Sequence, residues 1–102
     1  MIINNIDESK FNEYINDEVV LLDFYADWCG PCKMMGEVFQ DFENEYPDYK
    51  IISVDVDRFG SIARNYKVLS IPTIIIFSNG EVKKEKQGFM RLDELVAFVQ
   101  GE

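Results

Sequence analysis

The hydrophobic positions of the chain follow two patterns, one typical of buried strands and one typical of helices. Runs that are apolar almost throughout, rather than alternating, predict strands covered on both faces at residues 19–26, 49–56 and 73–77. Met34, Val38 and Phe42 recur every four positions, with Met35 and Phe39 beside them, which predicts an amphipathic helix ending near Pro47. The same kind of spacing predicts helices at about 7–15, 59–66 and 92–100.

Local signals place several of the element ends. Asp7 is suited to cap the first helix, and a short apolar start at Ile2 and Ile3 precedes it. Asn79-Gly80 is the pair best suited to a tight hairpin, because both central positions of such a turn need positive φ. Residues 81–87 are therefore predicted as a strand antiparallel to 73–77.

The order of these elements predicts an α/β fold. Strands that alternate with helices and are followed by a hairpin imply parallel strands with an antiparallel pair added, in a central mixed five-stranded sheet. Strands without a polar face imply helices on both faces of that sheet. With 102 residues, 47% of them hydrophobic, the chain has the size of one domain spanning residues 1–102.

Charge and composition exclude several classes of function. The formal net charge of -9 argues against binding to nucleic acid or to an anionic membrane, since both depend on clustered Lys and Arg. The longest apolar runs are too short to cross a bilayer, and residues 1–10 do not resemble a secretory signal. We therefore expect a soluble, cytoplasmic protein. The absence of histidine removes the usual proton shuttle and the usual metal ligand.

The two cysteines, Cys29 and Cys32, follow the carboxyl end of a predicted strand and open the helix after it. Functional groups of open α/β sheets usually lie at this edge. A free thiol with a pKa of about 8.5 is only about 3% ionised at neutral pH, and a pKa lower by ~1.5 makes it roughly half ionised. This change requires about 2 kcal/mol, which a helix amino terminus can supply. We expect the Cys29 thiolate to attack a disulfide and Cys32 to resolve the product.

Three other interpretations of the cysteine pair remain open. A structural disulfide closing so small a loop stabilises a protein by only roughly 2 kcal/mol, and such bonds are rare in the cytoplasm. A zinc site would need two further ligands, and the chain has no other cysteine and no histidine. The two thiols could also simply pack in the interior.

The segment from Asp23 to Lys33, which reads DFYADWCGPCK, closely resembles the active site of the thioredoxin family. The chain also matches this family at Ile71-Pro72-Thr73, Asn79-Gly80 and Gly88, so the resemblance covers essentially the whole chain. It implies a thioredoxin fold and a general protein disulfide reductase that a separate thioredoxin reductase keeps reduced. It also implies that the chain itself binds no cofactor.

The resemblance further implies a surface that docks protein substrates. Pro72 would be cis, and the backbone of Ile71 would pair with an extended substrate segment. The implied docking residues are Trp28, Gly30, Pro31, Ile71, Pro72 and Gly88. The alternative for Pro72 is a trans proline that opens an edge strand, and the alternative for Trp28 is packing in the core.

Asp23 matches the family's buried carboxylate behind the resolving cysteine. Its apolar neighbours should raise its pKa, so that it could accept the Cys32 proton near neutral pH; the alternative is a solvated aspartate at a strand end. The chain departs from the family at three positions. Ser53 replaces a lysine close to the buried carboxylate, from which we expect a higher Asp23 pKa than is usual. Glu37 replaces a helix-kinking proline, and Gln87 replaces an apolar residue of the docking groove.

Two further functions compete with disulfide reduction. An oxidase or isomerase would differ chiefly in reduction potential, but Gly30-Pro31 between the cysteines resembles the reducing members. A binding subunit could use the docking surface without electron transfer. We expect a monomer whose partners are protein disulfides and a reductase, with no metal, nucleic acid or membrane.

Overall fold

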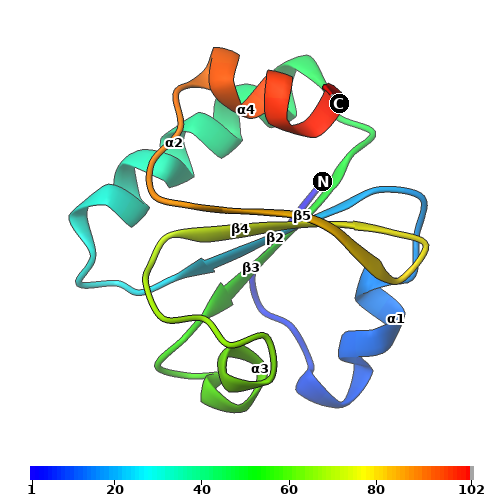
Figure 1. Ribbon diagram of the computed structural model, residues 1–102, viewed down its shortest axis with the longest axis vertical. Helices are drawn as coiled ribbons and strands as arrows, with labels where there is room; N and C mark the ends of the chain where they lie inside the picture. Colours follow the sequence, from blue (N-terminus) through cyan, green and yellow to red (C-terminus); the bar gives the residue numbers. More distant parts are fainter. Residues whose placement is uncertain (102) are drawn as a thin grey trace.

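The computed structural model describes residues 1–101 and contains one sheet with helices on both faces (Figure 1). The strands are β1 (Ile2–Ile3), β2 (Val20–Tyr25), β3 (Lys50–Asp55), β4 (Thr73–Ser78) and β5 (Glu81–Gln87). The helices are η1 (Glu8–Lys10), α1 (Phe11–Ile15), α2 (Gly30–Glu45), α3 (Gly60–Asn65) and α4 (Leu92–Gln100).

The sheet has the strand order β1-β3-β2-β4-β5. β3 runs parallel to both β1 and β2, whereas β4 pairs antiparallel with β2 and β5 antiparallel with β4. This confirms the predicted mixed five-stranded sheet. The hairpin is also as predicted, since Asn79 has φ 53° and Gly80 has φ 84°.

Each face of the sheet is covered by a pair of helices. Figure 1 shows α2 and α4 on one side of the sheet and α1 and α3 on the other. Consecutive residues of β2 pack into the hydrophobic cores on opposite faces of the sheet. Leu21 packs with Phe39 and Phe42 of α2, and Leu22 packs with the cluster that contains Phe11 of α1. Each such side chain stabilises the fold by about 1.5–3 kcal/mol when fully buried.

The buried face of α2 differs from the predicted one. Met35, Phe39 and Phe42 are fully buried, whereas Met34 is 52% exposed and Val38 lies at the margin of the core. The predicted stripe was therefore wrong at its start, because a helix turns once every 3.6 residues and a strict four-residue spacing drifts off the face that Met35, Phe39 and Phe42 turn toward the sheet.

The first helix also begins differently from the prediction. Asp7 does cap the segment, since its carboxylate accepts from the backbone N–H of Ser9 at 3.1 Å. However, residues 8–10 form a tighter 3₁₀ turn, and the α-helix begins only at Phe11. Such turns are common at the amino ends of helices.

Candidate active site

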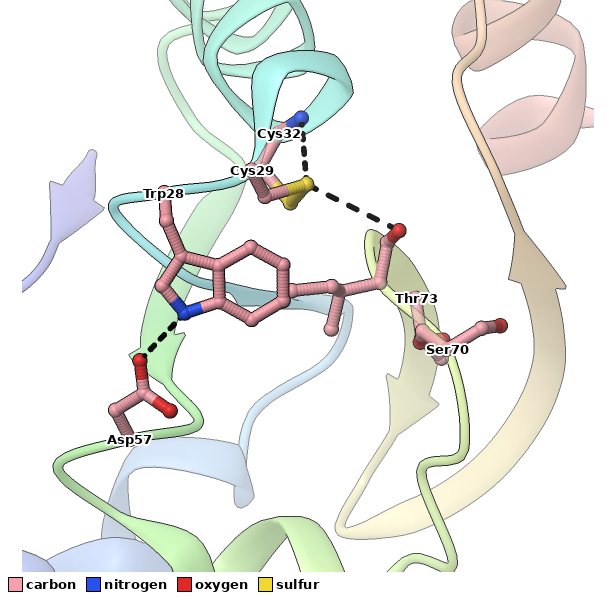
Figure 2. Close-up of a disulfide and its surroundings, with 7 residues drawn as sticks. Trp28, Cys29, Cys32, Asp57, Ser70 and Thr73 are labelled. Carbon is pink, nitrogen blue, oxygen red and sulfur yellow. Dashed lines mark hydrogen bonds between the residues drawn. A yellow bond between two sulfur atoms is a disulfide. The ribbon is translucent and has the colours of Figure 1, made fainter.

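The two cysteines lie where β2 leads into α2. Cys29 occupies the N-cap position of the helix, Cys32 lies in its first turn, and both are buried. Their sulfur atoms form a disulfide, with the Cα atoms 5.2 Å apart (Figure 2). The predicted position of Cys29 just before the second helix is confirmed.

The start of α2 favours negative charge on the sulfur of Cys29. The backbone N–H of Cys32 donates to Cys29 Sγ at 3.2 Å, and Pro31 occupies the opening of the helix, where a missing N–H costs nothing. The macrodipole of this helix places about half a positive charge at the same end. Both features favour a negatively charged group at this end of the helix.

The loop before β4 lies against the cysteine pair. The carbonyl oxygen of Ile71 is 4.0 Å from Cys29 Sγ, a contact that Figure 2 draws as the dashed line leading from the sulfur away from the helix. The Ile71–Pro72 peptide bond is cis, as predicted. Two hydrogen bonds hold the loop: the Thr73 hydroxyl donates to the carbonyl of Ser70 at 2.6 Å, and the Gly88 N–H donates to that of Pro72 at 2.8 Å.

Asp23 is a buried carboxyl in the middle of the sheet. It pairs in register with Ser53 on β3 and Ile74 on β4, and only 4% of it is exposed. One of its oxygens, Oδ1, has no hydrogen-bond partner among residues 1–101. Burial raises the pKa of Asp23 from 3.8 to about 7, as the sequence predicted, so the alternative of a solvated aspartate is wrong.

A pocket of about 260 Å³ is lined by both Asp23 and Cys32. It lies at the corner between β2, β3 and the first turns of α2. Its lining residues are Asn4, Asp23, Tyr25, Ala26, Asp27, Cys32, Lys33, Gly36 and Ser53. The carboxyl and the second sulfur therefore share one space that opens to solvent.

The predicted docking residues gather around the disulfide with different exposures. Trp28 is 71% exposed, so core packing is wrong for this residue. Gly30 and Pro31 are exposed as well, and Ile71 and Gly88 are half-buried. Pro72 is buried, so its ring adds little to the exposed surface although its peptide bond shapes the loop.

Comparison with known proteins identifies the family. The thioredoxin family model matches residues 2–101. The chain belongs to the thioredoxin family. It is 38% identical to thioredoxin from Bacillus subtilis over 100 residues, which cover 97% of this chain and 96% of the relative. It is 37% identical to thioredoxin from Staphylococcus saprophyticus over 101 residues, which cover 98% and 97%.

Solved thioredoxin structures share the fold. A mutant thioredoxin from Halobacterium salinarum superposes with a TM-score of 0.87 at 32% identity, over 97% of this chain and 88% of that one. Oxidised mitochondrial thioredoxin 3 from Saccharomyces cerevisiae gives a TM-score of 0.87 at 29% identity, over 97% and 93%. The chain thus has the thioredoxin fold, and as a member of this family it is a thiol–disulfide oxidoreductase.

Two residues of this thioredoxin site were missed by the sequence analysis. The indole N–H of Trp28 donates to Asp57 Oδ2 at 2.8 Å, which anchors one edge of the exposed ring (Figure 2). Leu69 is 92% exposed and borders a second pocket, of about 210 Å³, beside Trp28 and Ile71. Two signals were available: Asp57 follows the end of a predicted strand, and Leu69 is an apolar residue in a loop that no predicted element would bury.

Residues 1–101 contain no group of three or more His, Cys, Asp or Glu side chains placed to hold a metal ion. No helix among these residues is both long and apolar enough to span a bilayer.

Proposed function

We propose that this chain reduces disulfide bonds in other proteins, with Cys29 as the nucleophile and Cys32 as the resolving thiol. The observation that carries the proposal is the position of Cys29 Sγ at the N-cap of a 16-residue helix, where it accepts the Cys32 N–H. Within residues 1–101 no corresponding donor favours an anion on Cys32, so the two sulfurs are chemically different.

The proposed reaction takes place in two exchanges. The Cys29 thiolate attacks one sulfur of the substrate disulfide, which forms a mixed disulfide and releases the other substrate sulfur as a thiolate. Cys32 then loses its proton and attacks Cys29 Sγ. This step forms the Cys29–Cys32 disulfide and frees the second substrate sulfur as a thiolate, so that the substrate gains two electrons and the enzyme loses two.

Asp23 is the proposed base for the second exchange. Its carboxyl and Cys32 line the same pocket, and a pKa of about 7 suits proton transfer at neutral pH. With no histidine in the chain, this buried carboxyl is the group best placed to take the thiol proton. Protonation of Asp23 also removes a buried charge, which favours the step.

The surface around the disulfide is proposed to dock the substrate. Trp28 and Leu69 supply exposed apolar area on one side, and the half-buried Ile71 lies at the sulfur atoms with its carbonyl 4.0 Å away. The backbone of Ile71 would pair with an extended segment of the substrate, as in strand addition to a sheet. This surface would be completed or shaped by four further residues: Gly30, Pro31, Pro72 and Gly88.

The proposed electron source is a separate thioredoxin reductase, since thiol exchange itself needs no bound cofactor. We further propose that residues 1–102 act as one domain, as a monomer in the cytoplasm. A reducing role predicts a reduction potential of about −270 mV, the value typical of thioredoxins, whereas the potential of a strong oxidase is about −120 mV.

Insulin reduction tests the proposal. Reduced wild-type protein, regenerated by thioredoxin reductase and NADPH, should precipitate insulin chains, and Cys29→Ser should abolish this activity. Cys32→Ser should accumulate a mixed disulfide through Cys29. If the double Cys29→Ser, Cys32→Ser variant folds and keeps the biological activity of the wild type, the chain is a binding subunit and the proposal is wrong.

A further inference from the structure

The pocket beside Asp23 contains a charge imbalance that the proposed mechanism does not explain. The carboxyl lies on this pocket with Oδ1 unpaired, and the exposed carboxylate of Asp27 lines the same space. Ser53, opposite Asp23 in the sheet, offers a hydroxyl but no positive charge. Once Asp23 is ionised, it therefore needs a counter-charge from elsewhere.

The surroundings of Tyr25 at this corner of the molecule are mainly acidic. Burial raises the pKa of Tyr25, and the carboxylates of Asp55, Asp27 and Asp23 raise it further. Arg58 acts in the opposite direction, but it does not line the pocket. A mobile cation close by would be drawn toward this potential.

Lys33 is the one cationic residue among those that line the pocket. It follows Cys32 directly in the first turn of α2, and it is exposed. It takes part in none of the ion pairs formed within residues 1–101, so its ammonium group is not committed to another carboxylate.

The pocket leaves space beside the helix, next to Lys33. Gly36 lines the pocket one turn after Lys33, and a Cβ atom added at Gly36 would meet nothing within 4 Å. The pocket volume of about 260 Å³ is several times the ~30 Å³ that a water molecule occupies in the liquid. A lysine side chain can therefore enter the pocket and displace the water in it.

We propose that Lys33 reaches into this pocket and pairs with the Asp23 carboxylate, which holds the base in its charged form until Cys32 delivers a proton. The inference rests on the proposed role of Asp23. When the proton passes from Cys32 Sγ to the carboxylate, the ion pair loses its negative partner. Lys33 is then free to return to solvent as the new thiolate attacks Cys29 Sγ. Lys33 is thus a positioning residue that acts through Asp23, and it sets the pH range in which the second exchange is fast.

A two-phase kinetic assay separates this role from the chemistry of Cys29. Reduced protein is mixed with dithionitrobenzoate: attack by Cys29 releases the first thionitrobenzoate, and resolution by Cys32 releases the second. The rate of the second phase is measured by stopped flow from about pH 6 to about pH 9. The variants are Lys33→Gln, Lys33→Arg and Lys83→Gln. Lys83→Gln is the control because it removes the same charge from β5, an edge strand that does not border the pocket.

We expect Lys33→Gln to move the midpoint of the second-phase profile upward by ~1 pH unit, because an opposite charge close to a carboxyl lowers its pKa. Below the midpoint this corresponds to a loss of about tenfold in rate. Lys33→Arg should keep the wild-type midpoint. If Lys33→Gln matches Lys83→Gln, the pairing is refuted.

Asp23→Asn distinguishes failure of this inference from failure of the proposed function. If Asp23→Asn leaves the second-phase profile unchanged, Asp23 is not the base and both proposals are wrong at that step. If Asp23→Asn removes the rise of the second-phase rate near neutral pH but Lys33→Gln does not shift that rise, only the pairing of Lys33 with Asp23 is wrong. Adding Lys33→Gln to Asp23→Asn should cause no further change; a full shift in that background would show that Lys33 acts on the thiols directly and would overturn the inference.

Discussion

Replacing the buried carboxyl by Asp23→Asn should stabilise the protein at alkaline pH but not at acid pH. The pKa of Asp23 is raised to about 7 in the folded protein, against 3.8 for the usual carboxyl of an unfolded chain. Between these values the folded state binds a proton that the unfolded state has lost, so stability falls as pH rises. The loss begins near the lower pKa and is complete above the higher one.

The size of the effect follows from the difference between the two pKa values. Each pH unit in this window is worth about 1.4 kcal/mol, so the full cost of the ionised carboxyl at pH 8 is about 4 kcal/mol. Between pH 5 and pH 7 the wild type should lose about 2 kcal/mol relative to the asparagine variant, and between pH 5 and pH 8 about 3 kcal/mol. The comparison across pH matters because a buried asparagine has its own fixed cost, which cancels in the difference.

Urea unfolding of the disulfide form at pH 5 and pH 8 provides the test. The difference in unfolding free energy between Asp23→Asn and wild type should grow by about 3 kcal/mol, which moves the relative midpoint by about 1 M or more. Asp41→Asn is the matched control, since Asp41 is an exposed carboxylate on α2. If the curves of wild type and Asp23→Asn shift in parallel with pH, Asp23 does not titrate in this range and the reasoning is refuted.

Four further substitutions test other parts of the structure. Trp28→Ala should change the free energy of unfolding by less than about 0.5 kcal/mol because the ring is 71% exposed, yet it should lower kcat/KM for insulin more than for dithionitrobenzoate. Equal losses for both substrates would argue against a docking role. Lys84→Met removes the bonds from its Nζ to the carbonyls of Phe98 at 2.8 Å and Gly101 at 2.5 Å, so thermal unfolding should show a loss of about 1 kcal/mol. Gly80→Ala should cost about 1 kcal/mol because the residue has φ 84°, whereas Gly36→Ala, inside α2 and free of contacts, should be neutral or stabilising; effects of the same sign would contradict this account.

The sequence was most informative where a single physical signal dominates. The strands are recognisable because β2 and β4 are covered on both faces and therefore tolerate almost no polar residue. Asp23 stands out in such a run for the same reason, and its burial was predictable before any geometry was known. The turn at Asn79-Gly80 was equally clear, because few residue pairs accept positive φ twice.

Other features depend on how distant segments meet, and the sequence could not supply them. Met34 and Met35 are equally apolar, and only the direction in which α2 crosses the sheet decides which is buried. The hydrogen bond from Trp28 to Asp57 joins residues 29 positions apart. The pocket at Asp23 likewise forms only when β2, β3 and α2 lie in their final places. The sequence alone therefore could not show that Lys33 and Asp23 line the same pocket.

The pH dependence of Cys29 alkylation in the fully reduced protein is the most direct test of the account. Iodoacetamide should modify Cys29 selectively, with a rate midpoint clearly below the value of about 8.5 for a free thiol, while Cys32 stays largely unmodified. Peptide mapping after brief labelling identifies the modified sulfur. A midpoint at or above that of a free thiol, or preferential labelling of Cys32, would contradict the claim that the helix start holds the Cys29 sulfur as an anion.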